Sequence, residues 1–190
     1  MSSDTAMLDI EEALRTLDIV GNLADKAGYL DMFMKVKGER SGDIEGESLR
    51  KFSDGKSRHH ILGYYFSAGS PTDVGSGTAT GRRRYAAVRV VRNADAASSS
   101  LLSAFSTNDK LTVELSSYKA GGTESSQPMF RMELSDARVK TATLLGGGAL
   151  YGTGAVEIME FLFRSIVVEA APQGSTGQRA AVRTFTDSVG

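Results

Sequence analysis

The chain has 190 residues, of which 41% are hydrophobic and 24% are charged, and its formal net charge is -1. This length accommodates one hydrophobic core with extensions, and the near-neutral charge gives no electrostatic reason to expect nucleic acid or an anionic membrane as a partner. The chain has no cysteine, which excludes disulfides, thiolate nucleophiles and cysteine-containing metal sites.

The first residues are acidic, with Asp4, Asp9, Glu11 and Glu12 where a secretory signal peptide has a basic region and an apolar run. No stretch reaches the roughly 18 uninterrupted apolar residues of a membrane span. We therefore expect a protein that is made in the cytoplasm, lacks a classical export signal and does not insert into a membrane.

A helix is predicted over residues 4–27, because apolar residues recur there at spacings of three and four. The stripe consists of Met7, Ile10, Leu14, Leu17, Val20 and Ala24. Asp4 is a candidate N-cap, and Gly28 a candidate terminator. A lone helix of this length is marginal in water, so its stripe must be buried. We favour packing on the same chain over packing on a neighbour or another protein.

Strands begin at Asp31, where the period of the apolar residues changes to two. The polar stretch Glu39–His60 has no periodicity, and we interpret it as a projecting loop that lies outside the strands. Ile61–Ala68 is a further predicted strand, and Gly69–Gly81 a flexible connection.

The centre of the chain predicts a strand, a short helix and a second strand, over Arg82–Arg92, about Ala96–Ser106 and Lys110–Lys119. Asp95 occupies the expected N-cap position. The helix is expected to place Leu101, Leu102 and Phe105 against the sheet. In the second strand Thr112, Glu114 and Ser116 alternate with apolar residues, which predicts a polar face.

The remaining strands are predicted at Phe130–Leu134, followed by a bulge near Ser135–Asp136, and at Ala155–Ala170 as one long strand. Ala180–Phe185 is a candidate edge strand. The predicted fold is mainly β: a compact antiparallel β-barrel or sandwich with one short internal helix, plus an extra N-terminal amphipathic helix. The predicted organisation is an extension at 1–30, a barrel at 31–172 and a tail at 173–190.

The sequence offers no assembled active site. The run Gly75–Arg82 resembles a phosphate-binding loop, but its spacing is too long and it ends in arginine before a strand. His59 and His60 are the only histidines; as neighbours on a strand they point to opposite faces, so we expect surface roles and no shared metal. No nucleophile elbow accompanies them. Glu160 lies within an apolar run and is either a perturbed acid or, as we favour, a charge facing a lumen or neighbour.

Several motifs, taken in order, resemble the Hcp proteins, the haemolysin-coregulated tube subunits of bacterial type VI secretion. The similarity covers about residues 31–183. Its motifs are Asp31–Val36, Gly46-Glu47-Ser48, Tyr64-Tyr65-Phe66, Asp95–Ser98 with Leu101-Leu102, Lys119–Gly122, and Phe163 with Ile166 and Pro172-Gln173.

The resemblance implies a structural protein without enzymatic activity or cofactors. Its barrel subunits form hexameric rings that stack into the inner tube of a contractile machine, with a sheath, a spike and baseplate as partners and effector proteins in the lumen. Secretion through that machine would need no signal peptide. A tail-tube subunit of a phage or another contractile particle is the first alternative, and a secreted effector or carbohydrate-binding barrel the second.

Candidate sites follow from the resemblance and from the alternation of polar residues. The ring-stacking candidates are Glu39, Arg40, Asp43, Glu45, Glu47, Arg50 and Lys51, in a loop longer than the family usually has. The lumen-facing candidates are Tyr65, Thr112, Glu114 and Ser116. The helix at 4–27 is additional to the family pattern, so the resemblance assigns it no role.

Overall fold

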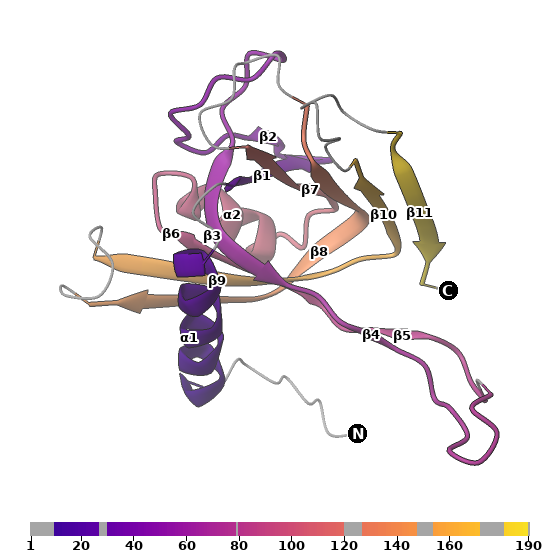
Figure 1. Cartoon of the computed structure of the whole chain (residues 1–190). Coiled ribbons are helices and arrows are strands. Elements are labelled where there is room, and N and C mark those ends of the chain that lie inside the picture. The colour runs from indigo at the N-terminus through magenta and orange to yellow at the C-terminus, as the bar shows by residue number, and fades with distance from the viewer. Residues whose placement is uncertain are drawn as a thin grey trace.

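The strands of the computed structural model close into a barrel (Figure 1). Residues 10–26, 30–78, 80–119, 127–147, 154–171 and 181–189 are described. Antiparallel pairing runs in a ring from β8 through β7, β1, β3, β6 and β9 back to β8. These strands are β1 (Leu30–Gly38), β3 (His59–Tyr65), β6 (Val88–Asn93), β7 (Leu111–Lys119), β8 (Phe130–Gly146) and β9 (Ala155–Leu162). The mainly β, barrel-like fold predicted from the sequence is confirmed.

The strand β8 belongs to both walls of the barrel. Its first part pairs with β7 and with β10 (Ser165–Ala170), and its second part pairs with β9. Between these parts the register against β7 slips by one residue, and Asp136 has a φ of 49°. The bulge predicted at Ser135–Asp136 is therefore confirmed, and it bends the strand from one wall into the other.

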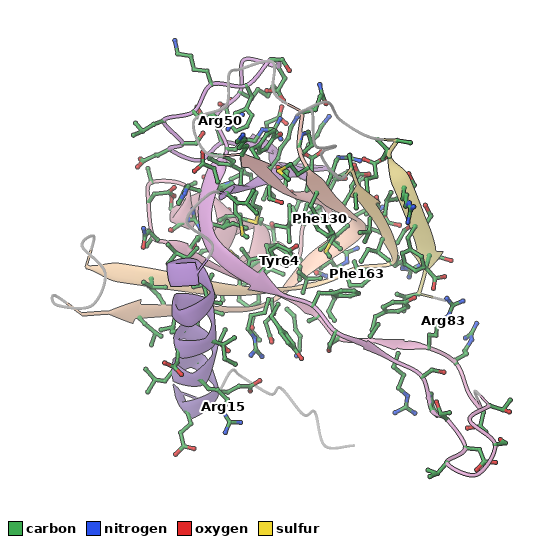
Figure 2. The ribbon with its side chains drawn as sticks, in the orientation of Figure 1. Arg15, Arg50, Tyr64, Arg83, Phe130 and Phe163 are labelled. Atoms are coloured by element: carbon green, nitrogen blue, oxygen red, sulfur yellow. The ribbon has the colours of Figure 1, made fainter. Side chains whose placement is uncertain are left out.

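We call the two walls the loop wall and the helix wall. The loop wall consists of β1, β7, the first part of β8 and β10; the helix wall consists of β3, β6, β9 and the second part of β8. Alternate side chains of both walls fill the interior, including Met34, Val90, Leu115 and Phe161. Tyr64 of β3, Phe130 of β8 and Phe163, which follows β9, join this core (Figure 2).

The single strand predicted over 155–170 is wrong, since the structure breaks it into β9 and β10 at Phe163–Arg164. The break carries the chain from the helix wall to the loop wall. The predicted C-terminal edge strand exists, but as β11 (Arg183–Ser188), which pairs with β10 along its whole length. Residues 172–180 lie outside the described residues.

The internal helix α2 (Ser98–Ser106) buries Leu101 and Ala104 in the barrel core. The expectation that Leu102 and Phe105 pack against the sheet is wrong, because they are 42% and 44% exposed. Asp95 precedes the helix and accepts a hydrogen bond from the backbone N–H of Ala97. It is therefore a turn residue before the helix, and Ala97 takes the N-cap position.

The N-terminal helix α1 (Ile10–Lys26) packs on the outer side of the helix wall, which confirms packing on the same chain (Figure 1). The buried residues of its described side chains are Ala13, Thr16, Leu17 and Val20. Ala13, Leu17 and Val20 pack against a patch made by Val91, Val156 and Ile158. Leu14, which the sequence placed in the buried stripe, is 53% exposed, so the buried face is rotated from the predicted one.

Gly63 allows this close approach of α1 to β3. A Cβ atom built on Gly63 would lie 2.8 Å from Cγ1 of Val20, which is a clash. We expect Gly63→Ala to destabilise the protein by about 1–3 kcal/mol, because α1 or β3 must shift. The matched control is Gly69→Ala, whose added Cβ meets nothing within 4 Å. Urea unfolding checks the free energies, and equal stability of the two variants would contradict this packing.

A long hairpin projects from the barrel beside the C-terminal strand (Figure 1). We call residues 66–87 the arm; it contains β4 (Ala68–Gly69) and β5 (Arg84–Tyr85), which pair with each other. The sequence predicted a flexible connection at Gly69–Gly81 and a continuous strand from Arg82. The structure instead has a short paired β5 and starts β6 at Val88, so the predicted strand begins too early.

Candidate assembly surfaces

The segment Glu39–Arg58 folds back over the outer side of the loop wall. It contains the short strand β2 (Gly42–Ile44), which pairs with β1, and its Ile44 joins the barrel core. Phe52 is buried against Phe33 and Tyr118, with ring centroids 5.1 and 5.7 Å away. The interpretation of this stretch as a loop lying clear of the strands is therefore wrong: removing Glu39–Ser57 would expose part of the core.

Most ring-stacking candidates are held by contacts within the chain. Glu39 pairs with Lys110 at 3.3 Å, Asp43 pairs with Lys56, and Glu45 accepts a hydrogen bond from the backbone of Ser57. The backbone of Arg40 donates to Asp109, and the guanidinium of Arg50 lies 4.4 Å from the ring centroid of Tyr118. Glu47 and Lys51 are also exposed.

Asp109 fixes the turn between β1 and β2. Its buried carboxylate accepts hydrogen bonds from the backbone of Arg40 and from the backbone and hydroxyl of Ser41. Burial raises the pKa of Asp109, but these hydrogen bonds outweigh it and lower the pKa below its ordinary value. Two of the stacking candidates, Glu39 and Arg40, therefore lie on a turn that is anchored to the residue preceding Lys110 and β7.

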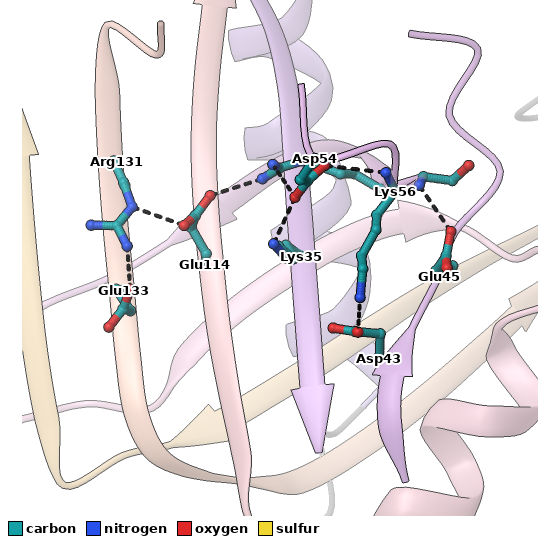
Figure 3. Close-up of polar contacts among 10 residues, drawn as sticks. Lys35, Asp43, Glu45, Asp54, Lys56, Glu114, Arg131 and Glu133 are labelled. Atoms are coloured by element: carbon teal, nitrogen blue, oxygen red, sulfur yellow. Dashed lines mark hydrogen bonds and ion pairs between the residues drawn. The ribbon is translucent and has the colours of Figure 1, made fainter. Parts of the chain in front are cut away.

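A row of ion pairs crosses the outer side of the loop wall (Figure 3). Glu114 on β7 lies between Arg58 and Arg131, at 2.9 and 2.8 Å. Arg58 continues to Asp54, and Asp54 to Lys35, at 3.2 and 2.7 Å. On the other side Arg131 reaches Glu133 and Glu169. This network fastens the folded-back segment to β1, β7 and β8.

The lumen-facing candidates lie on two different walls. Tyr65 is 52% exposed on the outer side of the helix wall, whereas Thr112, Glu114 and Ser116 lie on the outer side of the loop wall. Thr112 is exposed, but Glu114 is ion-paired and Ser116 is only 3% exposed beneath the folded-back segment. The structure therefore separates Tyr65 from the other three.

A buried charged cluster, which the sequence analysis did not foresee, lies inside the barrel. Arg92 and Glu157 are 0% and 1% exposed and form an ion pair at 2.7 Å. Arg92 also donates to Nδ1 of His59 at 3.1 Å and to Asp95 at 3.0 Å. His59 in turn donates from Nε2 to the carbonyl of Ile44. The cluster joins β3, β6 and β9 to β2 and to the start of α2.

The expected surface role holds for His60 and is wrong for His59. The two side chains do point to opposite sides of β3, since His60 is exposed and His59 is fully buried. Burial first, and then the charge of Arg92, lower the pKa of His59 from 6.5 to about 4. The sequence did contain a signal for this burial: His59 is two residues before Ile61 on the same strand, so both side chains face the same side, and Ile61 lies in the core.

Glu160 is a structural charge on the outer side of the helix wall. It is 5% exposed and pairs with Arg89 at 2.7 Å and Lys140 at 3.3 Å. Burial raises its pKa, but hydrogen bonds from Arg89 and Thr141 outweigh burial and lower the pKa overall. Arg89 also reaches Glu12 on α1, so this carboxylate helps to fasten the helix.

Asp187 of β11 holds the root of the arm. Its carboxylate accepts a hydrogen bond from the hydroxyl of Tyr85 and forms an ion pair with Arg83 at 3.1 Å. Figure 2 shows Arg83 near β11. The hydrogen bond from Tyr85 lowers the pKa of Asp187. Tyr85 also packs on Phe66 and Phe163, which anchors the arm to the barrel core.

We expect Asp187→Asn to loosen the arm without unfolding the barrel, because it weakens the contacts with Arg83 and Tyr85 and removes no core residue. Trypsin cleaves after arginine, so digestion at Arg82–Arg84 should become several-fold faster in this variant. Thr186→Ala, at an exposed neighbour on β11, is the control. Equal cleavage rates in the two variants would show that Asp187 does not hold the arm.

The described residues offer no arrangement typical of a catalytic or metal site. No group of three or more His, Cys, Asp or Glu side chains among them could hold a metal ion. The glycine-rich run that resembles a phosphate loop lies at the tip of the arm, where Asp73 accepts hydrogen bonds from Gly75 and Ser76. In the part of the chain that the structure describes, no helix is long and apolar enough to cross a membrane.

The family model described as "Type VI secretion system effector, Hcp" matches residues 33–169. The chain belongs to the Hcp family. This family consists of structural, secreted components of the type VI secretion system and is not a known enzyme family. No match was found among curated protein sequences.

Solved Hcp structures share the fold of this chain. A crystal structure of an Hcp protein has a TM-score of 0.66 and 20% identity, covering 84% of this chain and 99% of that one. A structure of a type six secretion system protein has a TM-score of 0.68 and 21% identity, with coverages of 83% and 96%. For the secreted protein Hcp3 from Pseudomonas aeruginosa these values are 0.59, 18%, 84% and 97%.

Proposed function

We propose that this Hcp protein is the building unit of a hollow tube: identical copies form hexameric rings, and the rings stack. In this proposal a sheath surrounds the tube, a spike or baseplate protein contacts its end, and effector proteins travel in the lumen. The machine then exports the tube without a signal peptide. The observation that carries the proposal is the family match over residues 33–169, which spans most of the closed barrel.

The surface of the chain is suited to repeated contacts between copies. β11 is the terminal strand of its sheet in the described structure. Phe185 on this strand is 47% exposed, and Val182, just before it, is 43% exposed. Edge strands with exposed apolar residues are a liability in a lone protein and are covered when copies associate head to tail. The arm adds a second projecting element, whose tip residue Val74 is fully exposed.

Electron microscopy of the purified full chain tests this proposal. We expect rings, and stacks of rings at high protein concentration, because heterologous contacts close into rings when the rotation between copies allows it. Sedimentation of the same sample measures the mass of the assemblies. A protein that stays a monomer at the highest soluble concentration would overturn the proposal.

Glu47 and Lys51 are the residues through which we test ring stacking. Both are exposed on the folded-back segment, and neither contributes to the barrel core. We expect the double reversal Glu47→Lys with Lys51→Glu to leave single rings intact and to reduce stacking. In the contact between two rings, each reversed side chain would then face a charge of its own sign on the neighbouring ring. Electron microscopy counts rings per stack.

The control for this variant is Arg15→Glu, which reverses an exposed charge on α1, away from the folded-back segment. Stacks as long as those of the unmodified protein in the double variant would contradict a role of Glu47 and Lys51. The arm would then be the remaining projecting element for the contact between rings.

A further inference from the structure

The helix α1 shares its surface with Tyr65. Gly63 and Tyr65 are two residues apart on β3, so they face the same side of the helix wall. Val20 of α1 lies against Gly63, which places the helix on that side. α1 therefore covers part of the surface to which Tyr65 belongs, on the wall that does not carry the folded-back segment (Figure 1).

The attachment of α1 is built into the barrel. Apolar contacts join Leu17 and Val20 to Val91 and Ile158. A polar clamp adds to them: the guanidinium of Arg89 donates to Glu12 at 2.7 Å and to the hydroxyl of Thr16 at 2.9 Å. Gly63 leaves the space that the helix needs. These complementary features indicate a permanent position of α1 on this wall.

This position restricts where α1 can lie in an assembly. The helix precedes the residues 33–169 that match the family, so it is an addition to the common barrel. If the tube proposed above forms, contacts between copies use surfaces of that barrel, and a permanent addition must occupy a surface that those contacts leave free. The free surfaces of a stacked ring are its channel wall and its outer wall.

We propose that α1 lines the channel, one helix per subunit, and that it narrows the channel and forms the surface that polypeptide cargo contacts. This inference rests on the proposed function and on the lumen-facing assignment of Tyr65, with which α1 shares its wall. The side of α1 away from the strands presents Glu11, Leu14, Arg15, Asp18 and Ile19. Leu14 and Ile19 are 53% and 48% exposed, and they offer apolar contacts to a polypeptide.

The absence of cysteine from the chain makes a direct test possible. Leu14→Cys introduces a single thiol on the exposed side of α1, and Thr112→Cys introduces one on the exposed outer side of the loop wall. Each variant is reacted as assembled tubes and as dissociated protein with N-ethylmaleimide and with a bulky polyethylene-glycol maleimide. Mass spectrometry measures the modified fraction.

We expect the thiol at position 14 to lose its reaction with the bulky reagent on assembly and to keep its reaction with N-ethylmaleimide, which can enter the channel. Thr112 lies on the other wall from Tyr65, so a channel lined by α1 and Tyr65 leaves this lumen-facing candidate outside it, and the thiol at position 112 should react with both reagents in both states. A thiol at position 14 that reacts with the bulky reagent equally in tubes and in dissociated protein would overturn the channel position. Electron microscopy of the same samples distinguishes this result from failure of the proposed function. If the proposed function is wrong, the samples contain no rings; if only the channel position is wrong, they contain rings.

Discussion

Glu157→Ala is expected to destabilise the barrel by about 3–5 kcal/mol, because it leaves the guanidinium of Arg92 buried without its main countercharge. The pair is almost inaccessible to solvent, at 0% and 1% exposure, and its N–O distance is 2.7 Å. A loss of this size is a large fraction of the stability of a typical domain. Urea unfolding, monitored by circular dichroism, measures the change.

The control for Glu157→Ala is Glu39→Ala, which removes one partner of the exposed pair with Lys110. Exposed pairs contribute less than about 1 kcal/mol, so the control should remain close to the unmodified protein. Glu157→Gln separates charge from shape, since it keeps the size of the side chain and removes the charge. A loss below about 1 kcal/mol for both Glu157 variants would contradict a stabilising role of the buried pair.

Lowering the pH is expected to destabilise the protein through His59. In the unfolded chain this imidazole has its ordinary pKa of 6.5, and in the folded barrel its pKa is about 4. The unfolded state therefore takes up the proton first as the pH falls. The contribution of His59 is complete above about pH 6.5, falls between 6.5 and 4, and amounts to about 3 kcal/mol over that interval.

Protonation would also disrupt the hydrogen bonds of the buried cluster. Nδ1 of neutral His59 accepts from Arg92, and it would become a second donor facing the same guanidinium. The charged groups that act on the imidazole are Arg92, which lowers its pKa, and Asp95, which raises it. Glu157 forms its ion pair with Arg92.

His59→Gln provides the comparison, because an amide can donate to Ile44 and accept from Arg92 without titrating. Urea unfolding between pH 4 and 7.5 should show a smaller pH dependence in this variant than in the unmodified protein. His60→Gln, at the exposed neighbour, should retain the full dependence. Equal pH dependences of the unmodified protein and the His59 variant would contradict this assignment.

The alternation of apolar residues predicted the barrel strands because each strand has one face in a common core. Leu111–Lys119 is correct to within a residue, and the phase change at Ser135–Asp136 located the bulge. The break at Phe163–Arg164 could not be predicted in the same way. Apolar residues occur on both sides of it, as in Phe161-Leu162 and Ile166-Val167, and neither glycine nor proline marks the passage from one wall to the other.

The contacts of the polar residues were the least predictable part. Glu39–Arg58 has no periodicity, yet Phe52 and Arg58 are buried, because Phe52 packs on Tyr118 and Arg58 pairs with Glu114, both distant in sequence. The helix α1 was predicted well as an element and less well in its orientation. Ala13 and Thr16 form its buried face because small side chains let the helix approach the strands, and a stripe chosen by hydrophobicity favoured Leu14.

The passage of β8 through both walls has a consequence for resistance to mechanical force. A sandwich of two independent sheets can be pulled apart by separating their faces, with each sheet left whole. Here β8 is hydrogen-bonded to β7, β10 and β9 along one continuous backbone. Separating the walls therefore requires rows of backbone hydrogen bonds to break together, so a subunit under axial load should fail cooperatively rather than by opening one wall at a time.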